Sequence, residues 1–369
     1  MKMPLTLSRY IARHFLMAIL IATFGLVAIT LLIDLVELLR RASSRENVSF
    51  GIVLQLVLLK IPYMMERMIP YAVLIGSMMA LTRLTRTHEL IVARAAGISV
   101  WQFLLPAIVV VLLLGALMTT VFNPLSAAML LRYEQIEARY LSSKASLLVV
   151  SSSGLWMRQI EEKNPNGISE HIINASRLSQ GDMAFSDVII FSFNQQKKFV
   201  ERLDAKRALL VPNELHLFNV VRSIPGKPPK LMEEFIMPTT LTMEYIQDSF
   251  ASPETMSFWR LPSFIDVLEK AGFSAIRHRL YFHSLMANPF LMAGMVWVAA
   301  VFSLRLPRRG KIGVLIVAGL ITGFVLYFFT NLIHSIGAAG TLPIELAAWA
   351  PAAVMLMIGA VLLLHIEDG

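Results

Sequence analysis

The feature that most constrains the fold of this chain is a set of long apolar runs. Four of them contain no Asp, Glu, Lys or Arg: His14–Ile33, Leu280–Leu304, Ile312–Ile344 and Leu346–Ile366. Each meets the requirement of roughly 20 apolar residues for a helix that crosses a bilayer. The mean hydropathy of +0.65 and the charged fraction of 16% are typical of membrane proteins and exclude an ordinary soluble domain.

Two more runs are long enough to span a membrane, although they are less uniform. We expect one span inside Ala95–Leu131, from Trp101 to Phe122. We expect another in Phe50–Thr82, which three charged residues interrupt: Lys60, Glu66 and Arg67. The sequence therefore predicts an α-helical integral membrane protein with six transmembrane helices.

The basic residues indicate how these helices are oriented. They precede the first span and lie between spans two and three and between spans four and five: Lys2, Arg9, Arg13, Arg83, Arg86, Arg94, Arg305, Arg308, Arg309 and Lys311. Short cytoplasmic loops carry an excess of Lys and Arg, so both termini are predicted to be cytoplasmic. The net charge of +8 then reflects membrane topology, and nucleic acid is not an expected partner.

A polar region separates two groups of three helices, so we divide the chain at residues 1–122, 123–276 and 277–369. Short runs bounded by turn formers predict strands at Gly167–Ser179, Ser186–Asn194, Lys198–Val211 and Glu214–Val221. The pattern returns to helix at Leu261–Ala271, just before the fourth span. Several short strands at this spacing favour a sandwich or barrel, inserted as an extracytoplasmic domain. The chain has no Cys, so this domain cannot be a disulfide scaffold.

The segment Leu81–Gly97 is charged and helix-forming, and it lies between two spans on the predicted cytoplasmic side. We expect a helix near residues 84–97 that ends at Gly97. A compact helix against the inner face of a membrane domain suits docking onto a soluble partner, for which Glu89, Arg86 and Gly97 are the candidate residues. The alternative is an amphipathic connector that lies on the lipid surface.

Two charged residues lie near the middle of the second span. Glu66 and Arg67 are flanked by Pro62 and Pro70. Charges at that depth are costly, so they normally face a cavity, pair with each other or serve a pathway. The alternative is that the prolines loosen the helix and the two side chains pair with neighbouring helices.

Further candidates lie at the outer end of span one and within span five. Arg40 and Arg41 occupy the level of anionic lipid headgroups, while Glu37 is the i, i+4 partner of Arg41 and favours a local salt bridge. In span five, Gly319 and Gly323 form a small-xxx-small pattern that permits close helix contact.

The sequence shows no catalytic apparatus. Gly226-Lys227 and Gly310-Lys311 lack the upstream glycine and the following Ser or Thr of a Walker A motif. His278 and His283 have i, i+5 spacing, which does not align them on one helical face, so we expect no metal site. We therefore expect a non-enzymatic chain without a cofactor, whose energy comes from another subunit or an ion gradient.

Several motifs, in order along the chain, resemble the LptF/LptG permeases of the bacterial lipopolysaccharide-export ABC transporter. They are RYIARHF in span one, PYAVLIGSMMALTRLTRTHELIVARAAGIS from span two through the coupling segment, GLWMR in the polar region and KIGVLIVAGLITGFVLYFFTNL in span five. The most specific is Glu89 followed eight residues later by Gly97. The resemblance covers nearly the whole chain. Its span-five pattern and the lack of a long tail after span six favour the G member of the pair.

The resemblance implies a multi-pass inner-membrane permease with a periplasmic β-jellyroll between helices three and four. Such a permease extracts lipopolysaccharide from the inner membrane and passes it to a periplasmic bridge. The implied partners are an LptF-like permease as heterodimer, a dimeric cytoplasmic LptB-like ATPase that holds ATP and Mg, a single-helix LptC-like protein and an LptA-like bridge protein.

The resemblance also implies roles for several residues. Glu89 would meet the ATPase, and Arg40 and Arg41 would meet lipid A phosphates. Helix five, with Gly319 and Gly323, would pack at a lateral gate through which the lipid enters. The chain departs from the family at Asp34, where the family can carry a basic residue, and this puts charge complementarity at that level in doubt.

A β domain that accepts acyl chains needs an apolar groove, because each buried CH₂ contributes about 0.8 kcal/mol. Period-two alternation places Ile189 and Phe191 on one face of a strand and Val188, Ile190 and Ser192 on the other. We expect the face with Ile189 and Phe191 to line the lipid path. The alternative is that Phe191 fills a closed core.

Two other functions fit the same architecture. One is a membrane-anchored sensor or scaffold whose β domain binds a periplasmic ligand. The other is an ion-coupled secondary carrier, in which Glu66 and Arg67 would be the coupling pair.

Overall fold

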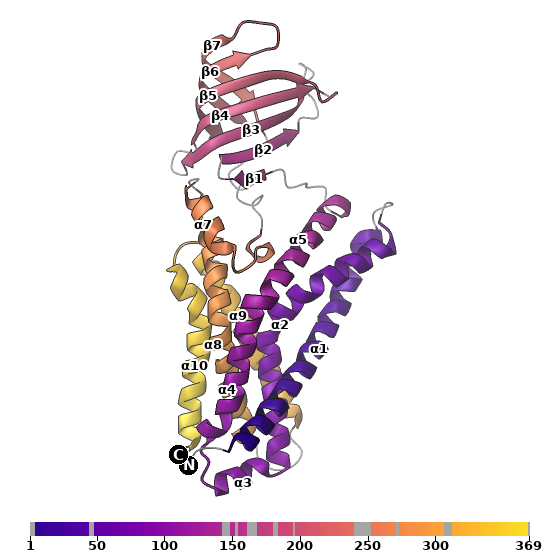
Figure 1. The fold of residues 1–369 in the computed structure, drawn as a ribbon, viewed down its shortest axis with the longest axis vertical. Coiled ribbons are helices and arrows are strands. Elements are labelled where there is room, and N and C mark those ends of the chain that lie inside the picture. The colour runs from indigo at the N-terminus through magenta and orange to yellow at the C-terminus, as the bar shows by residue number, and fades with distance from the viewer. Residues whose placement is uncertain are drawn as a thin grey trace. The chain divides into compact units, whose positions relative to one another are not determined.

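The computed structural model of the chain describes residues 4–43, 48–141, 148–151, 154–160, 168–179, 184–194, 196–239, 252–270, 273–305 and 312–367. The predicted cytoplasmic residues Lys2, Arg308, Arg309 and Lys311 lie outside these ranges. The chain forms two compact units (Figure 1). The helical unit comprises Met1–Leu141, Pro253–Leu261 and Ile276–Gly369, and the sheet unit comprises Ser142–Ser252 and Pro262–Ala275. The helical unit thus continues past the predicted boundary at residue 122.

Long helices build the helical unit. They are α1 (Leu5–Ser43), α2 (Phe50–Arg86), α3 (Glu89–Ala95), α4 (Val100–Leu117), α5 (Asn123–Tyr140), α8 (Ile276–Arg305), α9 (Ile312–Ala338) and α10 (Ile344–Glu367). A π-helical turn, η1 (Met118–Phe122), joins α4 to α5 without a break. A short 3₁₀ turn, η2 (Pro253–Thr255), belongs to the same unit, and α7 (Leu261–Lys270) follows it.

Five helical segments in the described part of the chain are long and apolar enough to cross a membrane. They are Leu5–Ser43, Val100–Tyr140, Ile276–Leu304, Val317–Ala338 and Ile344–Ile366. The remaining predicted span corresponds to α2, which is not among the five but is 37 residues long. At about 1.5 Å per residue, its length exceeds the roughly 30 Å of a hydrocarbon core.

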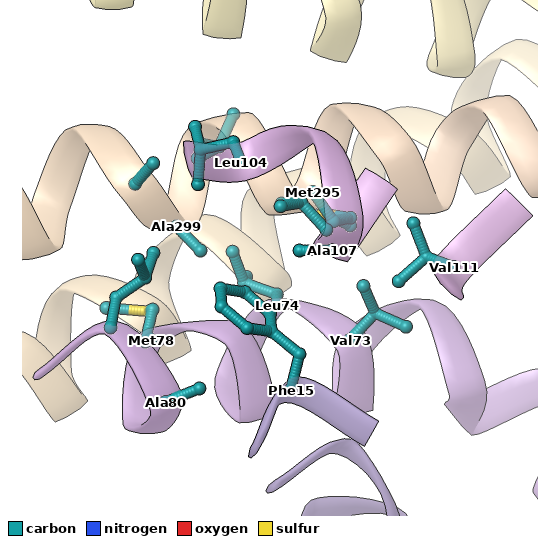
Figure 2. Packing of buried hydrophobic residues seen from close by; sticks show 14 of the residues in the cluster. Phe15, Val73, Leu74, Met78, Ala80, Leu104, Ala107, Val111, Met295 and Ala299 are labelled. Carbon is teal, nitrogen blue, oxygen red and sulfur yellow. The ribbon is translucent and has the colours of Figure 1, made fainter. Parts of the chain in front are cut away.

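The core of the helical unit lies where α1, α2, α4 and α8 meet. Phe15, Leu74, Leu81 and Leu104 are fully buried there. Figure 2 shows Phe15 pointing from α1 toward Leu74 of α2, with side chains of α4 and α8 closing the same layer. Because lipid tails are as apolar as these side chains, close packing rather than the hydrophobic effect holds such helices together.

One glycine permits the closest approach of α1 and α2. A Cβ atom added at Gly76 would lie 2.6 Å from the Ile19 Cα atom and 2.7 Å from the Ile19 nitrogen. No side chain larger than hydrogen fits against a backbone at that distance. Gly76 and Ala80 form a small-xxx-small pair that would have marked this contact in the sequence.

The described part of the sheet unit contains seven strands. They are β1 (Leu148–Ser151), β2 (Gly154–Ile160), β3 (Ile168–Ser179), β4 (Ala184–Asn194), β5 (Phe199–Val211), β6 (Glu214–Ser223) and β7 (Lys230–Pro238). They form one antiparallel sheet in chain order, each strand paired with the next (Figure 1). The four predicted strands correspond to β3–β6 and are confirmed. A jellyroll divides its strands between two sheets, whereas the described strands form a single sheet.

The two faces of the sheet differ sharply in burial. One face carries Ile173, Val188, Ile190, Leu203 and Val220, each at most 1% exposed. Register pairs Ile190 with both Ile173 and Leu203, so these side chains form one continuous layer. This face is therefore the core of the sheet unit.

Candidate functional site

The predicted coupling segment is a short helix that follows a break. The final turn of α2 runs to Arg86, and His88 then adopts a left-handed conformation with φ 62° that α-helix cannot continue. The predicted helix near residues 84–97 is thus divided, and α3 covers only Glu89–Ala95. Gly97 ends it as predicted: its φ is 80°, and Ile98 N donates to Ala93 O at 3.1 Å, which is a Schellman termination.

The Glu89 carboxylate is oriented by two hydroxyl groups. Its Oε1 atom accepts from Thr87 Oγ1 at 2.8 Å and from Tyr10 Oη of α1 at 3.2 Å. Within the described residues, Oε2 makes no hydrogen bond. The half-buried Glu89 thus keeps one carboxylate oxygen without a hydrogen bond to the described residues, and Arg86 near it in the chain is exposed.

Basic side chains gather around this segment at one end of the helical unit. Figure 1 shows the start of α1, the end of α10 and α3 at that same end. The exposed basic residues there are Arg9, Arg13, Arg83, Arg86 and Arg94. This arrangement is what the positive-inside pattern predicts for a cytoplasmic face.

At the other end of α1, Arg40 and Arg41 share one acidic partner. Arg40 Nη2 and Arg41 Nε each lie 2.8 Å from Glu37 Oε1, so the predicted Glu37–Arg41 pair is confirmed. Arg41 also reaches Glu137 of α5 at 3.3 Å, which links the two helices. The Arg40 side chain is 73% exposed and that of Arg41 is 51% exposed, so both keep donors directed to the surroundings.

Asp34, the departure from the family pattern, is neutralised within the chain. Its Oδ1 atom accepts from Lys60 Nζ of α2 at 2.5 Å. The same ammonium group lies 5.2 Å from the centre of the Tyr133 ring of α5. Asp34 and Lys60 therefore join α1 to α2, and Asp34 leaves no uncompensated negative charge at this level.

Glu66 and Arg67 do not pair with each other in the described part of the structure. Glu66 is 8% exposed, and its Oε1 atom accepts from Asn123 Nδ2 of α5 at 2.8 Å. Arg67 is exposed, and its Nη1 atom donates to Tyr63 Oη at 3.3 Å. The sequence reasoning missed Asn123, although an Asn just before Pro124 at the end of an apolar run was a visible signal.

The two glycines of span five face side chains of α2. A Cβ atom at Gly319 would lie 2.9 Å from Met78 Sδ, and one at Gly323 would lie 3.7 Å from Tyr71 Cδ1. Both neighbours belong to α2, so the glycine face of α9 packs against α2 of the same chain. Tyr71 and Tyr327 meet beside this contact with ring centres 6.4 Å apart.

Ile189 and Phe191 lie on the sheet face opposite the core. Both are half-buried. The Arg202 guanidinium lies 5.5 Å from the centre of the Phe191 ring, and Phe199 lies 6.4 Å from it. Phe191 therefore does not fill the closed core, which Val188 and Ile190 occupy on the other face.

His216 of β6 contacts two carboxylates, one on its own strand and one on β7. Its Nδ1 atom lies 3.1 Å from Glu234 Oε1 of β7, and its Nε2 atom lies 3.0 Å from Glu214 Oε2. No group of three or more His, Asp or Glu side chains in the described residues is arranged to hold a metal ion. The hydrogen bond to Glu234, and then that to Glu214, raise the pKa of His216 above its usual value.

We therefore expect the β6–β7 pairing to weaken as the pH rises from 6 to 8. A pKa raised by folding contributes stability that is complete below the unfolded value, near 6.5, and is lost above the folded value. Hydrogen exchange of β7 amides should thus be faster at pH 8 than at pH 6, after correction for intrinsic rates. A His216→Gln variant should lose this difference, and a difference that persists in the variant would assign it to another group.

The comparisons with known proteins agree with this arrangement. Residues 9–365 match the family Lipopolysaccharide export system permease LptF/LptG. The chain is 24% identical to the lipopolysaccharide export system permease protein LptG of Escherichia coli K12, over 97% of this chain and 98% of that protein. It is also 24% identical to LptG of Haemophilus influenzae, over 95% and 96% of the two chains. Because the family match extends over nearly all of its length, this chain belongs to the LptF/LptG family of lipopolysaccharide export permeases.

Proposed function

We propose that the chain is a permease subunit of an ATP-driven exporter that extracts lipopolysaccharide from the bacterial inner membrane. The family match over residues 9–365 carries this proposal. The relatives that match over 95–97% of the chain are named as lipopolysaccharide export permeases of the G type. The lipid would then pass through the inserted β domain to a periplasmic bridge, as the resemblance to the family implies.

The outer faces of α1 and α9 support a role in which these helices meet lipid and a second permease. In its apolar window, α9 is only 12% buried within the chain and α1 only 28%, whereas α8 is 67% buried. Both helices expose large side chains, including Phe24 and Ile21 of α1 and Phe324 and Phe328 of α9. We therefore assign these faces to a heterodimer with an LptF-like permease and to a lateral lipid gate between the two.

The basic end of the helical unit supports docking of a cytoplasmic ATPase, which would hold ATP and Mg. In this orientation, α2 crosses the membrane as well and brings the number of spans to six. Both termini are then cytoplasmic and the sheet unit is periplasmic. Transport in vesicles tests the whole proposal: export should stop when ATP is removed. Export that continues without ATP would favour the ion-coupled carrier, although Glu66 and Arg67 do not form the pair which that function would use.

Arg40 and Arg41 are proposed to contact lipid A phosphates. We expect an Arg40→Gln/Arg41→Gln variant to retain at least tenfold less lipopolysaccharide in the purified complex. A charge-assisted hydrogen bond contributes roughly 1.5–3 kcal/mol, which corresponds to about tenfold or more in affinity. The measurement is the lipid bound per complex, determined by mass spectrometry.

A matched control separates this lipid contact from helix packing. Glu137→Ala removes the partner of Arg41 on α5 and keeps both arginines, so lipid retention should stay at the wild-type level. Equal retention by the double variant and the wild type would show that the arginines only hold Glu37 and Glu137.

The open face of β4 is proposed to line the path of the lipid through the sheet unit. A photo-crosslinking amino acid at Phe191 should capture lipopolysaccharide only when ATP is supplied, because Phe191 lies outside the packed core. The same probe at the fully buried Ile190 should capture none. Capture that is equal with and without ATP, or stronger at Ile190, would contradict this assignment of the face.

A further inference from the structure

One buried amide joins four segments of the helical unit. Asn123 begins α5 directly after the π-helical turn and is 0% exposed. Its Nδ2 atom donates to Glu66 Oε1 of α2 at 2.8 Å and to Tyr281 Oη of α8 at 3.2 Å. Its Oδ1 atom accepts from the backbone nitrogen of Phe258 at 2.7 Å. Both hydrogens and the oxygen of the amide are thereby used, which fixes its orientation.

Phe258 belongs to residues 252–260, the segment by which the chain re-enters the helical unit after the strands; we call it the return segment. A second hydrogen bond holds this segment to the π-helical turn, from Trp259 Nε1 to Thr120 O at 2.9 Å. In an α-helix the Thr120 carbonyl would accept from the backbone N–H of residue 124, but this residue is a proline and has no N–H. The Trp259 indole supplies a donor to this carbonyl instead. The Phe258 ring also stacks on Phe282 of α8, with ring centres 5.1 Å apart.

The groups around Glu66 suit a neutral carboxylic acid. Its direct neighbours are the Asn123 amide, the Ser126 hydroxyl and, one step further, the Tyr281 hydroxyl. No Lys or Arg side chain forms an ion pair with Glu66 in the described residues. Arg67, which follows it in the chain, is exposed and donates to Tyr63 Oη. A buried carboxylate without a cation is strongly disfavoured, and a neutral acid removes that cost.

We propose that Asn123 is a positioning residue that latches the return segment to α2 and α8, with Glu66 held as a neutral acid. This Asn123 latch consists of Asn123, Glu66, Tyr281 and the Phe258 backbone. It bonds the start of α5 to the return segment, through which the chain comes back from the strands. A displacement of α2 or α8 during the transport cycle is therefore passed to the return segment. The proposal rests on the exporter function above.

The π-helical turn next to Asn123 is consistent with a functional role for the Asn123 latch. Such turns carry one extra residue in the helical ladder and occur frequently at functional sites. A polar cluster within an apolar helical unit is likewise expensive to keep, and such clusters usually serve the function of the protein.

Hydrogen exchange of the purified complex with its ATPase tests the latch. In the wild type, amide protection of residues 252–260 should change between the nucleotide-free and ATP-bound complex. In Asn123→Ala, exchange of this segment should be at least tenfold faster and should no longer respond to ATP, while the rate of ATP hydrolysis stays within twofold. Glu66→Gln should behave as the wild type, because its amide carbonyl still accepts from Asn123.

Each other outcome overturns part of the proposal. A wild-type return segment that does not respond to ATP, or an Asn123→Ala segment that still does, would show that the latch transmits nothing. Loss of the response in Glu66→Gln would show that the carboxylate charge is needed. Failure of the exporter function itself would appear differently, as an intact exchange response without ATP-dependent export of lipopolysaccharide in vesicles.

Discussion

A Glu89→Lys variant should insert into the membrane normally, lose its association with the ATPase and export no lipid. Glu89 offers a carboxylate oxygen at the tip of the basic end, and reversal of its charge places an ammonium group opposite a basic group of the partner. Like charges brought together in an interface cost several kcal/mol, and about 3 kcal/mol corresponds to roughly a hundredfold weaker association. Copurification of the ATPase with the variant, quantified against the wild type, measures this loss.

Glu89→Gln provides the matched control. It keeps an oxygen that accepts from Thr87 and Tyr10 and removes only the charge, so its association should be weakened far less. Full export by Glu89→Lys at the wild-type rate of ATP hydrolysis would exclude Glu89 from coupling. The alternative interpretation of Leu81–Gly97, an amphipathic connector on the lipid surface, would then hold.

A Gly76→Ala change in α2 should lower the thermal stability of the helical unit. The new methyl group would lie 2.6 Å from the Ile19 Cα atom, so α1 itself must move away from α2. Forcing additional atoms into a packed core costs typically about 1–3 kcal/mol. The measurement is the midpoint of thermal aggregation in detergent.

Gly25→Ala is the control, because no atom lies within 4 Å of a Cβ added there. Alanine favours helix over glycine by about 1 kcal/mol, so this variant should be as stable as the wild type or more stable. Equal midpoints for the two variants would mean that the contact between α1 and α2 at Gly76 contributes nothing.

The sequence predicted the elements whose patterns are strong and local. Apolar and polar residues alternate clearly in the strands β3 to β6, and turn formers bound them, so their positions could be predicted from the sequence. The strand β7 carries Glu233 and Glu234 side by side, which breaks the alternation, and only its pairing with β6 makes it a strand. The helix α5 is polar, so composition assigned it to the inserted domain, whereas the π-helical turn carries the helix through to Tyr140.

In the candidate site, too, the sequence predicted the local features and missed the contacts between distant residues. Spacing alone found the Glu37–Arg41 pair and the Gly97 helix stop, because both depend on residues a few positions apart. The partners of Asp34 and Glu66 could not be predicted from the sequence, because Lys60 and Asn123 lie 26 and 57 residues away in the chain. Helix packing decides such contacts, and a single sequence does not specify which faces meet.

The strand order of the sheet unit has a consequence for how the protein is made. Each described strand after the first pairs with the strand synthesised just before it, so no β contact among the described strands waits for a distant part of the chain. Loops between neighbouring strands close at low entropic cost, and local pairing of this kind speeds folding. The sheet can therefore grow hairpin by hairpin during translation and be complete before α8, α9 and α10 leave the ribosome.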